Sequence, residues 1–103
     1  MRKVINGKLY DTDTANEIAS DSYLYASAFS HWVETLYQTR NGSWFLVGEG
    51  GPSSRYSVSV GQNQWGGGSQ IIPLSKAKAL AWLEEHAGVD VVLEHFGSQV
   101  VEA

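Results

Sequence analysis

Alternating apolar and polar residues predict two β-hairpins, each with an Asn-Gly pair at its turn. The first runs from Arg2 to Tyr10, with apolar residues on both sides of Asn6-Gly7. The second runs from His31 to Glu49, where β-branched and aromatic side chains flank Asn41-Gly42. Asn-Gly favours the two-residue turn that needs positive φ at both central positions. We therefore expect antiparallel strands at both places.

The turn length of the second hairpin decides which side chains face each other. If the loop is Asn41-Gly42 alone, Glu34 lies directly opposite Glu49. A three-residue loop, 40–42, shifts the register and places the two glutamates diagonally. Facing carboxylates repel each other, so such a pair would need a cation or a bound proton. Paired carboxylates of this kind occur in divalent metal sites and in glycoside hydrolases. The alternative is that each glutamate pairs with a Lys or Arg or faces water.

The residues after the first hairpin predict a short helix. Asp11 to Thr14 supplies several N-cap side chains. The apolar spacing that follows predicts a helix over Ala15 to Ser20. Residues 21–30 mix aromatic residues with Ser and Ala and fit no single element.

Residues 50–70 are rich in glycine and contain one short alternating strand, Tyr56 to Val60. An unpaired edge on this strand would suit self-association and a homo-oligomer. Ile71-Ile72 is expected to form a brief edge strand, with Pro73 limiting its pairing.

Two helices are predicted near the C-terminal end. Ser75 is the N-cap of the first, and strong helix formers run from Lys76 to Ala87. Asp90 caps a second short helix that runs through Phe96. The order of elements predicts one α+β domain over residues 1–103. We expect an antiparallel sheet built from hairpins, with an N-terminal short helix and two C-terminal helices packed on one side.

The amino-acid composition excludes several classes of protein. The 103 residues contain no cysteine, which excludes disulfide scaffolds, thiol catalysis and cysteine-based zinc sites. Four Trp, five Tyr and three Phe supply the core that a chain without disulfides needs. The N-terminal residues lack the apolar run of a signal peptide, and no apolar run has the length of a membrane span. We expect a cytoplasmic protein with no membrane contact.

The charge is unevenly distributed. The net charge is −4, but the last 25 residues hold five acids and no Lys or Arg, so they carry −5 and the first 78 carry +1. No direct nucleic-acid binding is expected from this balance. Four acids in the predicted helices suit a basic groove on another protein and form a candidate partner-binding surface: Glu84, Glu85, Asp90 and Glu94. The alternative is a solvated helix surface that keeps the protein soluble.

No set of residues matches a catalytic motif. None of the three histidines has a partner at metal-ligand spacing, and His86 and His95 are placed to interact with helix dipoles. The glycines at 48–51 lack the Gly-Lys-Ser/Thr end of a P-loop. We therefore expect no enzymatic activity and no cofactor.

Aromatic residues in the glycine-rich region are candidates for partner binding. Trp65 and Tyr56 lie where burial in the core is not assured, and exposed Trp and Tyr commonly anchor protein interfaces. The alternative for Trp65 is that it folds back as a lid on the core.

Three segments, which together cover more than half of the chain, resemble segments of a known family: NGKLYDTDTA (6–15), ETLYQTRNGSWFLVGEGGPSSRYSVSVGQNQWGGG (34–68) and IIPLSKAKALAWLEEH (71–86). They resemble a family of short, mostly uncharacterised proteins of conjugative elements and phages of Firmicutes and Actinobacteria. The resemblance implies an accessory protein of mobile DNA, a setting in which inhibitors of host defence, including anti-CRISPR proteins, are common. The chain departs from the family at Lys76 and Lys78, where acids are expected in the first helical turn.

The first hypothesis is a small non-enzymatic cytoplasmic binding protein of a mobile element or phage. It would inhibit a host defence protein of the CRISPR type, with a nucleic-acid-binding effector as partner, through the acidic helices and exposed aromatics. One alternative is a carboxylate-based metal-binding or hydrolytic domain that uses Glu34 and Glu49. Another is a self-associating structural module that pairs through its exposed strand.

Overall fold

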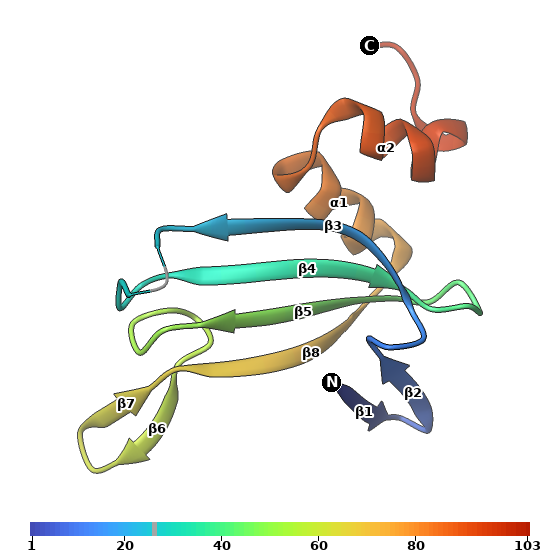
Figure 1. The fold of residues 1–103 in the computed structure, drawn as a ribbon. Coiled ribbons are helices and arrows are strands. Elements are labelled where there is room, and N and C mark those ends of the chain that lie inside the picture. Colours follow the sequence, from blue (N-terminus) through green and yellow to red (C-terminus); the bar gives the residue numbers. More distant parts are fainter. Residues whose placement is uncertain (26) are drawn as a thin grey trace.

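The chain forms a four-stranded antiparallel sheet, two separate hairpins and two helices (Figure 1), in a computed structural model that describes residues 1–25 and 27–103. The strands are β1 (Arg2–Ile5), β2 (Lys8–Asp11), β3 (Asn16–Tyr23), β4 (Trp32–Gln38), β5 (Trp44–Gly50), β6 (Val58–Gly61), β7 (Gln64–Gly66) and β8 (Gly68–Leu74). The helices are α1 (Lys76–His86) and α2 (Val89–Phe96), followed by a 3₁₀ turn at Gly97–Gln99. The predicted α+β class with antiparallel strands is confirmed.

The central sheet has the strand order β3-β4-β5-β8, and every neighbouring pair is antiparallel. β8 is an edge strand of seven residues, longer than the brief strand predicted at Ile71-Ile72. Pro73 lies within it opposite Phe45. An edge strand tolerates proline because the missing N–H can face away from its single neighbour.

The two Asn-Gly turns differ in length, and the second sets the register of the sheet. At Asn6-Gly7 the φ angles are +52° and +76°, as the predicted two-residue turn requires. In the β4–β5 hairpin the Thr39 amide donates to the Ser43 carbonyl at 2.8 Å, so the loop comprises residues 40–42. Gly42 has the positive φ, +88°, that ends such a loop. Of the two loop lengths considered for this hairpin, the longer is formed.

The short helix predicted over Ala15 to Ser20 is wrong, because residues 16–20 belong to β3 and Ala15 lies in the bend before it. The strand pairs with β4 and contains a bulge between Glu17 and Ala19. With this bulge, both Ile18 and Ala19 pack against the main core, while Ala15 packs against a second cluster. The apolar spacing that resembles a helical turn is therefore that of a bulged strand.

Helix α1 begins where the sequence predicts. Ser75 Oγ accepts a hydrogen bond from the Lys78 amide at 3.2 Å, which confirms its role as N-cap. α1 ends at His86, and Gly88 rather than Asp90 is the N-cap of α2. Asp90 lies in the first turn, where its charge favours the helix dipole. Neither α1 nor α2 has the length and apolarity to cross a bilayer.

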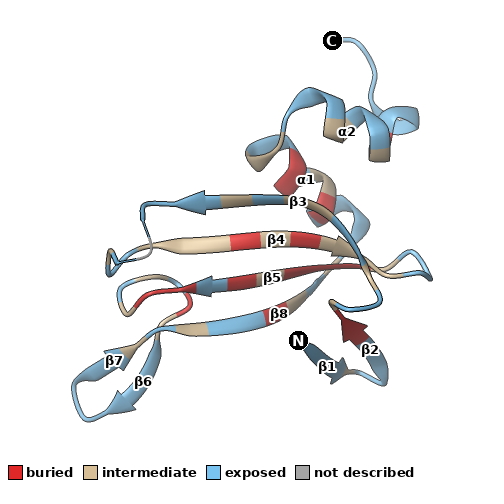
Figure 2. Cartoon of the chain, viewed as in Figure 1, coloured by how far each residue is buried: buried red, intermediate tan, exposed pale blue. Residues whose placement is uncertain are grey.

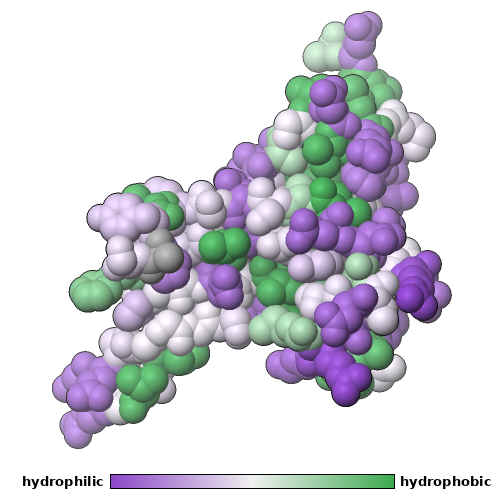
Figure 3. Space-filling model, in the orientation of Figure 1, coloured by the Kyte–Doolittle hydropathy of each residue, from purple (hydrophilic) through white to green (hydrophobic). Residues whose placement is uncertain are grey.

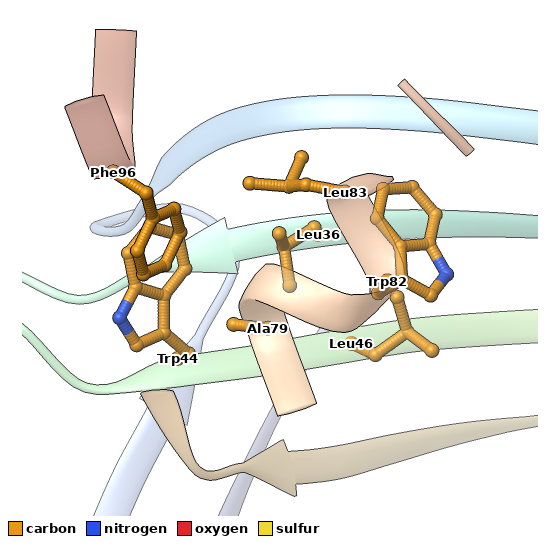
Figure 4. Packing of buried hydrophobic residues seen from close by; sticks show 7 residues of the cluster. All are labelled: Leu36, Trp44, Leu46, Ala79, Trp82, Leu83 and Phe96. Atoms are coloured by element: carbon orange, nitrogen blue, oxygen red, sulfur yellow. The ribbon is translucent and has the colours of Figure 1, made fainter. Parts of the chain in front are cut away.

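Apolar residues gather on both faces of the sheet. The main core joins the sheet to the helices (Figure 4) and consists of Leu36, Trp44, Leu46, Ala79, Trp82, Leu83 and Phe96. A second cluster, to which the β1–β2 hairpin contributes, contains Tyr10, Phe45 and Ile71 on the other face. Figure 2 shows the buried residues concentrated in β4, β5 and α1, whereas the β6–β7 hairpin is exposed.

Glycines on the helix-covered face of the sheet make room for the loop between β5 and β6. A Cβ on Gly48 would overlap the ring of Tyr56, and one on Gly50 would overlap the side chain of Ser54. A Cβ on Gly68 would lie 2.5 Å from the Tyr56 carbonyl oxygen. The loop therefore lies directly against bare backbone of β5 and β8.

Gly48→Ala is expected to lower the free energy of unfolding by about 2 kcal/mol or more, because the new methyl group overlaps the Tyr56 ring. Gly97→Ala is the control, since no heavy atom lies within 4 Å of its Cβ position and its φ is −55°. The control should change stability little or raise it. Urea denaturation measures both variants, and equal losses would contradict the close approach of the loop.

Candidate functional site

Glu34 is a charged side chain of β4 that the fold buries almost completely, with 4% of its surface exposed. Its Oε1 accepts a hydrogen bond from Trp82 Nε1 of α1 at 2.9 Å, and its Oε2 accepts one from the Tyr56 hydroxyl of the β5–β6 loop. Arg55 Nη1 lies 3.4 Å from Oε2. The carboxylate therefore connects the sheet, a loop and a helix, and its charge is paired.

The Tyr56 hydroxyl serves as a permanent donor to this carboxylate. Burial raises the pKa of Tyr56, and the hydrogen bond to Glu34 raises it further, so the hydroxyl stays protonated at physiological pH. Among the described residues, no buried side-chain nitrogen or oxygen lacks a hydrogen-bond partner. A general acid or base must reach its substrate, whereas Tyr56 is only 1% exposed. The arrangement is therefore that of a structural anchor.

The carboxylate pair predicted at Glu34 and Glu49 is not formed. The three-residue turn places Gly48 opposite Glu34 and Val33 opposite Glu49, so the two glutamates lie on opposite faces of the sheet. The diagonal arrangement considered for the longer loop is wrong for the same reason. Within residues 1–25 and 27–103, no group of three or more histidines and carboxylates is placed to hold a metal ion.

Of the two aromatic residues predicted to contact a partner, one is buried. The prediction that Tyr56 belongs to an exposed partner surface is wrong, because its ring lies over Gly48 and its hydroxyl reaches Glu34. Trp65 is 61% exposed on the β6–β7 hairpin, which projects from the sheet (Figure 1). Trp65 therefore does not act as a lid on the core, and its contact with a partner stays a prediction.

His86 has a partner that sequence spacing does not reveal. Its Nδ1 lies 2.8 Å from Asp21 Oδ2, and its ring stacks on Trp82 with 4.8 Å between ring centroids. The hydrogen bond from His86, with one from the Ser22 amide, lowers the pKa of the Asp21 carboxyl. Asp21 and His86 are 65 positions apart, so no local pattern connects them. His86 and His95 both lie in the last turns of their helices, as the predicted dipole interaction requires.

The four acids predicted to face a partner are all exposed on α1 and α2. Beside them, α2 exposes two apolar side chains one turn apart, Val89 at 72% and Leu93 at 47%. Figure 3 shows hydrophobic and hydrophilic residues intermingled over α2. We call the following six residues the acidic helical surface: Glu84, Glu85, Val89, Asp90, Leu93 and Glu94.

Tyr56→Phe is expected to lower the free energy of unfolding by about 1.5–3 kcal/mol, because it leaves one oxygen of a buried carboxylate without its donor. Glu34→Gln should cost a similar amount. The double variant should lose less than the sum of the two single losses in urea denaturation, because both substitutions remove the same hydrogen bond. Tyr37→Phe is the control, since its hydroxyl makes no hydrogen bond within the described part of the chain. Strictly additive losses would show that Glu34 and Tyr56 are not coupled.

The Asp21–His86 contact predicts a pH dependence. Because the pKa of Asp21 is lowered by folding, its ionised form stabilises the fold above the ordinary value of 3.8, and this contribution is lost as the pH falls below that value. Asp21→Asn should therefore destabilise the protein by less than about 1 kcal/mol near pH 6, since the carboxylate is partly exposed. The difference from wild type should shrink as the pH falls from 5 to 2. Thermal unfolding measures this difference in stability, and the exposed Asp13→Asn variant is the control. A difference that does not change with pH would refute the Asp21–His86 contact.

No protein-family model, curated protein or solved structure matches this chain.

Proposed function

We propose that this chain is a small binding protein that occupies a positively charged surface of a partner protein through its acidic helical surface. The observation that carries the proposal is the exposed pair Val89 and Leu93 beside exposed acids. In protein interfaces, a few desolvated anchors supply most of the binding energy. Charges around them steer association and reject wrong partners. The acidic helical surface combines both features.

The charges of α1 support a role in binding, because helix stability does not explain them. Glu84 and Glu85 lie at the C-terminal end of α1, where the helix dipole is negative. Lys76 and Lys78 lie in the first turn, where the dipole is positive. Charges in these positions oppose the dipole and cost roughly 0.3–1 kcal/mol each. A positively charged partner supplies a reason for the two glutamates.

The partner that we propose is a nucleic-acid-binding effector of host defence, with CRISPR effectors as the first to test. The resemblance to proteins of mobile elements and phages supports this choice. An array of exposed carboxylates also matches the sign of the phosphates that such an effector binds. The chain would then act in the cytoplasm as a non-enzymatic inhibitor that competes for the nucleic-acid groove.

Self-association is a second candidate function, favoured by the exposed β6–β7 hairpin. β6 begins at Val58 rather than at Tyr56, and β7 is its single neighbour in the sheet order. Val60 and Trp65 are 62% and 61% exposed on this hairpin. Pairing between two copies along β6 would cover them.

The triple variant Glu84→Lys/Glu85→Lys/Glu94→Lys is expected to abolish inhibition. The test uses bacteria whose CRISPR effector targets a plated phage. Expression of the wild-type chain in these bacteria should raise plaque formation at least tenfold, whereas expression of the variant should not. With purified effector and guide RNA, the variant should weaken binding at least tenfold, mainly through the association rate and with a reduced salt dependence. Leu93→Ser should instead raise the dissociation rate, because it removes an apolar anchor.

The matched control is Asp13→Lys/Glu17→Lys/Glu49→Lys, which makes the same change of charge at exposed positions outside the acidic helical surface. This control should retain both inhibition and binding. If wild type fails to protect the phage, or if both triple variants lose binding equally, the proposed function is refuted.

A further inference from the structure

A cleft lies at the end of the molecule where α1 begins. Two adjoining grooves of about 420 and 610 Å³ open between the β1–β2 hairpin, the β4–β5 turn and the start of α1. Lys8, Tyr10 and Ser43 line both grooves, so the two are adjacent, and we refer to them together as the cleft. Each volume falls within the range of small-molecule binding sites.

Three cations line this cleft, whereas none of the described residues that line it is an Asp or Glu. Lys76 lines one groove, Arg40 lines the other and Lys8 lines both. The ion pairs found among the described residues include none of these three side chains. Like charges that face one space repel each other unless an anion neutralises them. The cleft therefore has the electrostatic character of an anion site, in a chain whose net charge is −4.

The backbones of these cations belong to ordered elements, whereas their side chains are exposed. Lys8 is the first residue of β2, directly after a two-residue turn, and pairs with Ile5 of β1. Arg40 lies in the hydrogen-bonded β4–β5 turn. The buried rings of Tyr10 and Trp44 line the cleft and pack against the two core clusters. Ligand binding therefore needs no rearrangement of the backbone, although it must order the exposed Lys and Arg side chains.

Polar donors accompany the cations. Ser43, which carries a hydroxyl, lines both grooves, and Asn41, which carries an amide, lines the larger one. His95 of α2 lines the smaller groove, where its Nε2 lies 3.9 Å from Glu94 Oε2. Hydroxyl, amide and imidazole N–H groups all donate hydrogen bonds to oxyanions.

We propose that this cleft binds a small ligand that carries two or more phosphate groups. Phosphate oxygens accept charge-assisted hydrogen bonds from Lys ammonium and Arg guanidinium groups. Lys76 lines only one groove, Arg40 lines only the other, and Lys8 lines both. Because the cations are spread over two grooves, we expect the ligand to carry at least one phosphate for each groove. A long nucleic-acid strand fits less well, because the acidic end of the chain repels an extended polyanion. This site does not rest on the proposed function, and its lining contains none of the six residues of the acidic helical surface.

Isothermal titration calorimetry with tripolyphosphate and with ADP tests the proposal on the full chain. At least one of the two should bind saturably with a stoichiometry of one, above a sodium chloride control of equal ionic strength. Amide shifts in ¹H–¹⁵N spectra should move at Lys8, Ser43 and Lys76. Lys8→Gln/Arg40→Gln/Lys76→Gln should weaken binding at least tenfold. Its melting temperature without ligand should stay near that of wild type, because all three side chains are exposed.

The matched control, Arg2→Gln/Lys3→Gln/Lys78→Gln, makes the same charge change at exposed residues that do not line the cleft and should bind as wild type does. Three results would overturn the proposal: no saturable binding of either phosphate compound, equal weakening in both triple variants, or tighter binding of a single-stranded oligonucleotide than of either compound. The last result would assign the cleft to nucleic acid instead.

Discussion

The buried carboxylate of Glu34 constrains three elements of this small domain at once, the sheet, the β5–β6 loop and α1. Glu34 lies in β4 with almost no contact with water. Removing a carboxylate from water costs several kcal/mol unless other donors replace its hydration. This cost is on the order of the stability of a whole domain. Those donors come from Tyr56 and Trp82, so the β5–β6 loop and α1 must both close over the same part of the sheet. Glycine at position 48 follows from this, because the Tyr56 ring reaches the carboxylate by lying on bare backbone.

The anchored helix also separates the charges of the molecule. Trp82 and Leu83 hold α1 against the sheet, which leaves its two ends at different surfaces. Its lysine-bearing end borders the cleft that also contains Lys8 and Arg40. Its glutamate-bearing end continues into the acidic helical surface on α2. Eleven helical residues span roughly 16 Å, so Lys76 borders the cleft while Glu84 and Glu85 lie near the other end of α1. Glu94 of α2 lies closer to the cleft, beside His95.

Burial changes the meaning of several residues that look functional in sequence. Tyr56 is an interface candidate by composition, yet it is a structural hydrogen-bond donor inside the fold. Glu34 is a catalytic or metal-ligand candidate by spacing, yet its oxygens are occupied by a tyrosine, a tryptophan and an arginine. The acids of α1 and α2 are exposed because helical periodicity directs them away from the apolar side chains that are buried in the main core. The three cations that line the cleft come from separate elements of the fold. Only the tertiary structure therefore identifies the cleft, because no local sequence pattern connects them.

Features whose causes lie within a few residues follow directly from the amino-acid sequence. The Asn6-Gly7 turn, the Ser75 cap and the acidic C-terminal helices depend on local backbone preferences and on composition. The tertiary structure decided the rest. It made residues 16–23 a strand, because pairing with β4 outweighs a weak helical pattern. It also separated Glu34 from Glu49, since one extra turn residue shifts the register and moves every following side chain to the other face.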